Sequence, residues 1–343
     1  MREAEEFATW LSEAAERIGA HSACCIRLDH PDLPVALAEN HARVEAWLAD
    51  GKQGEMEYLE RMLPQKSDPW TTFPHAQAVI VLTFTHGGGP AGAVHPFPIP
   101  EMGAPIGYVS SYAREIDYHA RGQAMLAELH TLLGREVEAE AAVDTKPVYE
   151  RMFATLGGLG IIGANNLLRV PDRTNVRVFI GTLFVNADLP NVIHDVKMPF
   201  GCEDCLACII NCPTDAIRPG KPIDAPRCIS YLTIEKRSVL SRVEAEMMGD
   251  WIFGCDECSN VCPPKEKIDS RIPVDLAWLL KQPAGEIRRT IKGNATAYAG
   301  VTQLRRNAVA MLKLREDPVA KELLGWTARQ SGSALIQEQL RAW

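Results

Sequence analysis

The 343-residue sequence has no apolar run long enough to cross a membrane, and its first residues lack the basic and then apolar pattern of a secretory signal. It also lacks two common phosphate-binding fingerprints, G-x-G-x-x-G after a strand and G-x-x-x-x-G-K-[ST]. Hydrophobic residues make up 46% of the chain and charged residues 23%. We therefore expect a soluble, cytoplasmic protein without either nucleotide-binding fingerprint.

Basic residues are outnumbered by acidic ones, which gives a net charge of −8, and the charge is unevenly distributed along the chain. Residues 265–343 hold 14 Lys and Arg against 8 Asp and Glu, a surplus of +6 that leaves −14 on the remainder. A basic tail on an acidic body permits a polyanionic partner without requiring one. The length suggests two or three domains.

Cysteine is concentrated in one region, where eight of the ten residues lie between Cys202 and Cys262. The first run reads C-x₂-C-x₂-C-x₃-C-P; a lone Cys228 and a C-x₂-C-x₃-C-P run follow. In such two-cluster sequences the fourth cysteine of a run binds the other [4Fe–4S] cluster. We therefore predict two clusters with crossed ligands. Their ligand sets are Cys202, Cys205, Cys208 and Cys262 for the first, and Cys212, Cys228, Cys255 and Cys258 for the second.

Zinc and disulfides are the alternatives for these cysteines. Structural zinc would need two C-x₂-C pairs, which leaves the third and fourth cysteines of the first run without a role. Disulfides are typical of small secreted domains, and this chain shows neither property. Iron–sulfur clusters are the favoured interpretation.

Hydrophobic periodicity predicts alternating helices and strands before the cysteine region and helices after it. The expected helices are Glu3–Ile18, Pro34–Ala49, Glu55–Met62, Asp117–Leu133, Ile272–Leu280, Thr302–Leu314, Pro318–Thr327 and Ser333–Ala342. The expected strands are Ser22–Leu28, Ala78–Phe84 and Asn175–Val185, with Cys24 and Cys25 as small core residues and Gly87–Pro105 as a long loop. The alternation predicts an α/β (α+β) domain over residues 1–195. A ferredoxin-like two-cluster domain over 196–268 and a helical region without strands over 269–343 would follow.

Several notable segments of the first domain match no known functional motif when their residue spacing is considered alone. The glycine-rich stretch Gly157–Gly163 matches no phosphate fingerprint and predicts a tight turn or a close approach to a cofactor. Asp117 is a natural N-cap. Asp144 follows a short apolar run and, taken alone, is an ordinary loop or capping aspartate.

Taken together, these segments resemble the epoxyqueuosine reductase family over nearly the whole chain and in the same order. The matching stretches are Gly54–Tyr58, Tyr112–Arg114, Asp117–His119, Val143–Thr145, Glu150–Arg151, Gly158–Gly160, Cys212–Thr214, Arg227–Thr233, Gly254–Asp256, Val261–Pro263 and Leu304–Ala308. The segment around Cys228 is the most specific of them, because ordinary ferredoxins lack it.

The resemblance implies a base-off cobalamin between an α/β domain and the two clusters. The family reduces the epoxide of epoxyqueuosine, at the wobble position of tRNA, to the alkene of queuosine. That reaction takes two electrons and two protons, and water leaves. The resemblance further implies Asp144 as the proton donor, cobalamin contacts at Ser110, Asp144, Leu168, Ser230 and Asp256, and an external electron donor such as a ferredoxin or flavodoxin.

Some positions depart from the family's usual residues and leave the substrate open. Lys146 stands where Gly is common, Ala164 where Lys is usual, and Thr182 where Glu is usual; Glu115–Ile116 and Lys66 also differ. A paralogue that reduces a small molecule with the same cofactors is therefore an alternative, and an electron carrier without its own substrate is another. The basic tail residues suit tRNA phosphates or a solvated helix face. They are Arg288, Arg289, Lys292, Arg305 and Arg306.

Overall fold

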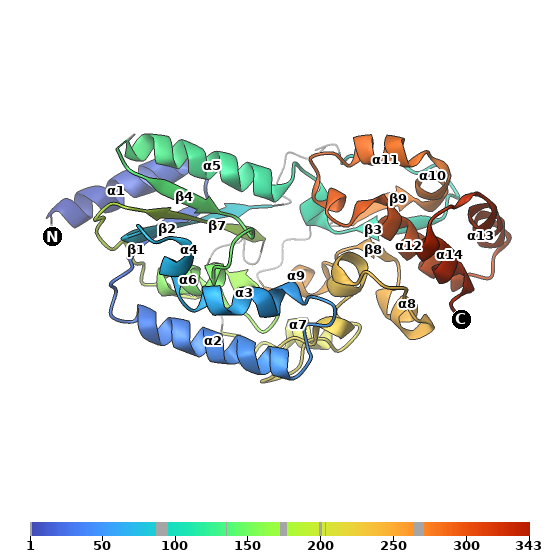
Figure 1. The fold of residues 1–343 in the computed structure, drawn as a ribbon, viewed down its shortest axis with the longest axis horizontal. Helices are drawn as coiled ribbons and strands as arrows, with labels where there is room; N and C mark the ends of the chain where they lie inside the picture. Colours follow the sequence, from blue (N-terminus) through green and yellow to red (C-terminus); the bar gives the residue numbers. More distant parts are fainter. Residues whose placement is uncertain are drawn as a thin grey trace.

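The computed structural model describes residues 2–86, 95–134, 136–171, 177–198, 201–202, 204–263 and 271–343. Figure 1 shows an elongated molecule with one sheet and its helices near the N-terminus and a second sheet with the C-terminal helices at the other end. The short helices α7 and α9, Ala207–Ile210 and Glu257–Asn260, lie between these two parts. In the part of the chain that the structure describes, no helix is both long and apolar enough to span a membrane.

The first sheet is antiparallel throughout, with the strand order β1-β2-β7-β4. Its strands are β1 (Ser22–Arg27), β2 (Ala78–Thr85), β7 (Val178–Val185) and β4 (Ala139–Ala142). Seven successive residues of β2 are buried, which explains its continuous apolar sequence, because a strand covered on both faces has no polar side. The three strands predicted here are present, although residues 175 and 176 lie outside the described part of the chain.

Helices cover both faces of this sheet. Leu11 of α1 (Arg2–Arg17) and Leu126 of α5 (Tyr118–Leu133) pack on one face. Leu37 of α2 (Leu33–Ala49) and Phe153 of α6 (Glu150–Leu156) pack on the other. Successive strand residues point to opposite faces, so the neighbouring Cys24 and Cys25 enter different cores. Both are fully buried, as predicted for small core residues.

The second sheet joins distant parts of the chain in the order β8-β3-β9. Its strands are β8 (Trp251–Phe253), β3 (Ile106–Val109) and β9 (Ile272–Asp275). Strand β3 comes from the predicted first domain, yet it pairs with two strands that follow the first cysteine run. The domain boundaries at 195 and 268 stay predictions, and β3 packs with the C-terminal core.

The helical prediction for Ile272–Leu280 is wrong in its first half. Ile272 and Val274 alternate toward the core as strand β9, which pairs with the distant strand β3. The helix α10 (Leu276–Lys281) begins only after Asp275, whose carboxylate accepts from the backbone N–H groups of its first turn. The tail therefore contains a strand that the sequence did not indicate.

The C-terminal helices pack around α12 (Gly300–Lys313), most of whose residues are buried. The others are α8 (Arg242–Met248), α11 (Ala284–Thr290), α13 (Pro318–Gln330) and α14 (Ala334–Arg341). The helix predicted over Glu55–Met62 begins later, as α3 (Tyr58–Lys66). Of the predicted loop at 87–105, residues 87–94 lie outside the described part, and 95–105 contain no helix or strand. The remaining short elements are α4 (Pro69–Thr72), β5 (Ile161–Ile162), β6 (Leu168–Arg169), a π-helix (Tyr231–Glu235) and three 3-10 helices (Ser111–Ala113, Ala225–Arg227 and Ala295–Ala297).

Candidate active site and cysteine centres

The first group of cysteines gathers around Cys208, which is buried on α7. Burial raises the pKa of the Cys208 thiol, and the neighbouring thiols of Cys262, Cys202 and Cys205 raise it further. These four residues therefore lie close enough to interact electrostatically, although Cys262 is far from the others in sequence. They are the predicted first ligand set.

The second group gathers around Cys258 on α9. Burial raises the pKa of Cys258 well above its usual range. The nearby thiols of Cys228, Cys255, Cys208 and Cys212 raise this pKa further. Burial raises the pKa of Cys255 as well, and Cys228 is the thiol that adds to it. Because Cys258 also interacts with Cys208, the two groups adjoin one another.

The surroundings of the cysteines are rich in hydrogen-bond donors. Arg169 is fully buried, with Nη1 3.8 Å from Cys202 Sγ and Nη2 donating to Pro263 O at 3.4 Å. The hydroxyl of Thr214 lies 3.6 Å from Cys212 Sγ. All ten cysteines are free, and within the described ranges no three His, Cys, Asp or Glu side chains are arranged to hold a single metal ion. Two adjoining sets of four thiols are the donors that a pair of cubane clusters requires.

Two cavities adjoin beside the second cysteine group. The larger has a volume of about 660 Å³ and extends from α2 to Cys228 and Ser230. The smaller, of about 470 Å³, extends toward Tyr112, Tyr118 and Tyr298. The two share wall residues from α3, the loop after β4, α6 and the π-helix. These shared residues are Leu59, Lys66, Asp144, Val148, Glu150, Ile234 and Glu235.

Asp144 lies where the two cavities meet, with an exposed side chain. Its φ of 52° is in the left-handed region, which a non-glycine residue adopts only where contacts stabilise it. Tyr118 provides one such contact, since its hydroxyl donates to Asp144 Oδ2 at 2.8 Å. Glu150 provides the other, since its Oε1 accepts the backbone N–H of Asp144 at 2.7 Å. The carboxyl group of Asp144 is thus held toward open space.

Aromatic packing fixes the tyrosine that holds Asp144. The ring of Tyr118 stacks on Phe179, with centroids 4.1 Å apart and planes inclined by 9°. His119 covers the tyrosine ring at 4.0 Å. Burial raises the pKa of Tyr118, and the Asp144 charge raises it further, so its hydroxyl stays protonated and remains a donor.

The sequence-predicted cobalamin contacts fall in three different environments. Ser110 and Asp256 are both buried, and the Ser110 hydroxyl donates to the Asp256 carboxylate, which also accepts from Ser111 N at 2.7 Å. Leu168 is buried in the core beneath the first sheet. Only Ser230 and Asp144 line the larger cavity. The role of each as a cofactor contact stays a prediction.

Two of the residues that we expect to depart from the family's usual ones, Lys146 and Thr182, have side chains with bonding partners in the structure. Lys146 lines the smaller cavity, but its ammonium pairs with Glu140 on β4 and lies 5.3 Å from the Phe73 ring centroid. Thr182 is fully buried and its hydroxyl donates to Ala142 O at 3.3 Å, which ties β7 to β4. Ala164 lines the larger cavity.

Two of the five basic tail residues do not fit the prediction of a phosphate-binding or solvated face. Arg306 is fully buried, and its guanidinium donates to Leu232 O at 3.1 Å and Lys236 O at 2.7 Å. Arg305 donates to Leu279 O at 2.9 Å and is half-buried. Backbone carbonyls bind these two side chains within the fold. The other three, Arg288, Arg289 and Lys292, are exposed.

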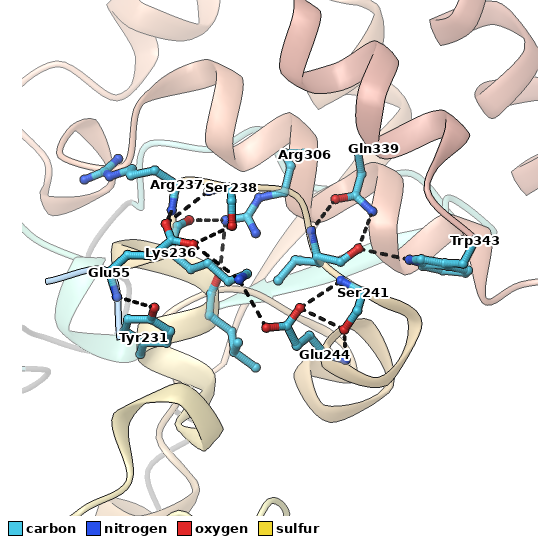
Figure 2. Close-up of polar contacts among 12 residues, drawn as sticks. Glu55, Tyr231, Lys236, Arg237, Ser238, Ser241, Glu244, Arg306, Gln339 and Trp343 are labelled. Atoms are coloured by element: carbon cyan, nitrogen blue, oxygen red, sulfur yellow. Dashed lines mark hydrogen bonds and ion pairs between the residues drawn. The ribbon is translucent and has the colours of Figure 1, made fainter. Parts of the chain in front are cut away.

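A polar network ties the start of α3 to the segment after Cys228. Figure 2 shows Glu55 pointing toward Arg237 and Ser238, whose backbone N–H groups donate to Glu55 Oε2 at 2.6 and 3.2 Å. Lys236 Nζ lies 3.3 Å from Glu55 Oε1. Burial raises the pKa of Glu55, but these donors, with the Ser238 hydroxyl, outweigh it and lower the pKa to about 2.

Gly54 allows this network to form. Its φ is +60°, and an added Cβ would lie 2.2 Å from the hydroxyl oxygen of Tyr231. That hydroxyl accepts the backbone N–H of Glu55 at 2.7 Å, so the tyrosine cannot move away without losing the bond. The α3 wall of the cavities is therefore attached to the π-helix that follows Cys228.

The sequence did not single out several residues of this site. Glu150 and Tyr118 appeared only as members of matching stretches, and Glu235 did not appear at all. No sequence signal identifies the partners of Asp144, because the contacts depend on its left-handed backbone and on the packing of Phe179. Lys66 lines both cavities, a position that its sequence context does not indicate.

Two family models match the chain. A model described as "4Fe-4S double cluster binding domain" matches residues 201–265, and one described as "Epoxyqueuosine reductase QueG" matches residues 66–145. The first covers all eight clustered cysteines, and the second ends just after Asp144.

Curated proteins named epoxyqueuosine reductase are similar in sequence. One from Shewanella oneidensis is 35% identical over 66% of this chain and 58% of its own length. One from Cellulophaga algicola is 34% identical over 66% of this chain and 71% of its own length. One from Vibrio cholerae is 29% identical over 90% of this chain and 85% of its own length. The aligned region thus spans less than two thirds of the Shewanella relative.

Solved structures share the fold. An epoxyqueuosine reductase from Streptococcus thermophilus superposes with a TM-score of 0.79 at 20% identity, over 97% of this chain and 88% of that one. One from Bacillus subtilis, described with an aspartate catalytic loop swung out of its active site, gives 0.79 at 19%, over 98% and 89%. An epoxyqueuosine reductase bound to an epoxyqueuosine-modified tRNA stem loop gives 0.75 at 19%, over 99% and 98%. At these identities the likeness establishes the mixed helix and strand fold.

Proposed function

Since the chain belongs to the epoxyqueuosine reductase family, we propose that it reduces the epoxide of epoxyqueuosine in tRNA to the alkene of queuosine. The reaction consumes two electrons and two protons and releases water. The position of Asp144, at the junction of two cavities beside a group of four cysteines, carries this proposal. At this position a proton donor and the electron-carrying clusters would both be close to a substrate bound in the cavities.

The eight clustered cysteines would hold two [4Fe–4S] clusters with crossed ligands. Two electrostatic contacts support the crossing. Burial raises the pKa of both Cys208 and Cys228; Cys262 is the first of the thiols that raise the pKa of Cys208 further, and Cys212 is the thiol that does so for Cys228. The adjoining position of the two sets suits stepwise electron transfer from one cluster to the other. A one-electron donor such as a ferredoxin or flavodoxin would supply the electrons.

The larger cavity would hold the corrinoid. Its walls combine apolar residues such as Trp47, Met56 and Leu59 with several cationic groups. These surfaces suit a large apolar ring carrying a phosphate-linked tail. The cationic residues are Arg43, Lys66, Arg151, Arg218 and Lys221. When bound, cobalamin supplies the low-potential, strongly nucleophilic metal centre that the reduction requires.

The residues of the chain would then bind and protonate the substrate. The smaller cavity is lined by Tyr58, Tyr112, Tyr118 and Tyr298, flat side chains on which an unstacked base can rest. Tyr118 orients the Asp144 carboxyl, and Asp144 would donate a proton to the epoxide oxygen as its carbon–oxygen bond breaks. The exposed residues Arg288, Arg289 and Lys292 remain candidates for phosphate contacts.

The test is conversion of tRNA that contains epoxyqueuosine. Protein prepared without oxygen, loaded with iron, sulfide and cobalamin, and given a reduced donor should turn the modified nucleoside into one lacking a single oxygen atom, measured by mass spectrometry. A parallel reaction with the free nucleoside reports whether the tRNA is needed. No conversion of either substrate by cofactor-loaded protein would contradict the proposal and favour a paralogue with another substrate.

A further inference from the structure

A second carboxyl group lies next to Asp144 in both cavities. Glu150, the first residue of α6, lines the larger and the smaller cavity together with Asp144. Its Oε1 accepts the backbone N–H of Asp144 at 2.7 Å, so the two residues are in direct contact. The reaction proposed above uses Asp144 as the proton donor and leaves the Glu150 carboxyl without a role.

The proposed reduction needs two protons, and Asp144 carries one. The first goes to the epoxide oxygen when the carbon–oxygen bond breaks, and the second completes the departing water. The two electrons come from the external one-electron donor. We propose that Glu150 supplies the second proton by re-protonating Asp144 within each turnover. This inference rests on the proposed function.

The charges around Glu150 favour a carboxyl that keeps its proton near neutrality. Burial raises the pKa of Glu150 to about 7, and the charge of Asp144 also raises it. The bond from Asp144 N, Lys66 on α3 and Arg151 on α6 act in the opposite direction. An ordinary exposed glutamate is ionised at this pH and stores no proton.

The side chains of α2 complete these surroundings. Arg43 on α2 lines the larger cavity with Glu150, and His41 Nδ1 lies 3.5 Å from the hydroxyl of Tyr149, the residue before Glu150. The charged residues Lys66, Asp144, Arg151, Arg218, Lys221 and Glu235 line the same cavity. Of the two other carboxyl-bearing residues in this set, Asp144 is the one with a hydrogen bond to Glu150 among the described residues.

Glu235 is the competing candidate, because its carboxyl also lines both cavities. Its Oε2 accepts the hydroxyl of Tyr298 at 3.2 Å, and no hydrogen bond joins it to Asp144 among those of the described residues. Burial raises the pKa of Glu235 as well, and the Asp144 charge adds to this, whereas Tyr298 and Arg237 lower it. Contact with Asp144 therefore favours Glu150, and the comparison of the two glutamates is the natural control.

The test compares Glu150→Gln, Glu150→Asp and Glu235→Gln in the cofactor-loaded protein. Glutamine keeps an oxygen that can accept the Asp144 N–H but has no titratable proton. We expect kcat of Glu150→Gln to fall about 100-fold with an unchanged KM for tRNA, the magnitude usual for a lost acid. Wild-type kcat should fall as the pH rises through about 7, because Glu150 then loses its proton. This pH dependence should vanish in Glu150→Gln and persist in Glu150→Asp and Glu235→Gln.

A measurement without turnover gives an independent readout. Infrared difference spectra of the protein should contain a protonated carboxyl band that titrates near neutral pH in the wild type and in Glu235→Gln but not in Glu150→Gln. If Glu150→Gln keeps the wild-type kcat and pH profile, Glu150 only holds the backbone and the inference is wrong. The same conclusion follows if the band disappears in Glu235→Gln instead. If the wild type converts no epoxyqueuosine, the proposed function fails, and the infrared titration still decides whether Glu150 stores a proton.

Discussion

The cysteine region and the cavities at Asp144 are assembled in opposite ways. Seven of the eight clustered cysteines belong to two compact runs, so their spacing alone predicts their chemistry. The cavities take their walls from segments as distant as Asn40 and Tyr298, and their central aspartate has no recognisable motif. In the proposed function, electron transfer would therefore depend on local cysteine spacing, whereas proton delivery would depend on the tertiary fold.

The strongest test of the cysteine side of this comparison is Cys228→Ala. Cys228 is the one cluster ligand outside the two runs, and its loss should remove one cluster, so that iron falls from about eight to about four atoms per chain. Iron analysis and the cluster absorbance of protein purified without oxygen measure this. Cys24→Ala is the matched control, because Cys24 is buried in the first sheet, and it should keep all the iron. Full iron in Cys228→Ala would exclude it as a ligand.

The corresponding test of the cavity is Asp144→Asn. Asparagine preserves the shape and can still accept from Tyr118, but it cannot donate an acid proton. Turnover should fall by at least about 100-fold, while iron and cobalamin contents stay at wild-type levels. Cofactor analysis accompanies the rate measurement. Turnover at the wild-type rate would mean that another group protonates the epoxide.

The Glu55 network links the cavity wall to the segment after Cys228. We expect its loss to have a smaller effect, on the stability of the protein rather than on turnover. The folded-state pKa of Glu55 is about 2, below its ordinary value, so its contribution is present above pH 5 and is lost as the pH falls toward 2. Glu55→Gln should lower the free energy of unfolding by about 1 kcal/mol at neutral pH, since the group is partly exposed and screened. Urea unfolding at several pH values measures this. A difference that does not shrink in acid would show that the Glu55 charge is not the cause.

The smallest effect is expected for Lys146→Gly, which introduces the residue that the family resemblance leads us to expect at this position. The lysine ammonium pairs with Glu140, and partly exposed pairs of this kind contribute at most about 1 kcal/mol. Turnover of tRNA epoxyqueuosine should stay close to that of the wild type in a steady-state assay. A large gain would instead indicate that Lys146 restricts the substrate in the smaller cavity.

Local patterns predicted three strands of the first sheet, the covering helices α1, α2 and α5, and the cysteine runs, but not the covering helix α6. The strands β3 and β9 were missed because each has only four residues and pairs with a segment far away in sequence. Arg306 was misread because charge suggests a surface position, whereas backbone carbonyls bind its guanidinium in the core. The partners of Asp144 were invisible for the same reason, since they depend on tertiary contacts rather than on spacing.

The most direct test of the account is an electron count. Protein loaded with both cofactors is titrated with a one-electron donor in the presence of tRNA that contains epoxyqueuosine, and queuosine is measured at each step. The account predicts one queuosine for every two electrons consumed, with no product in the Asp144→Asn variant. Consumption of electrons without queuosine formation in the wild type would contradict it.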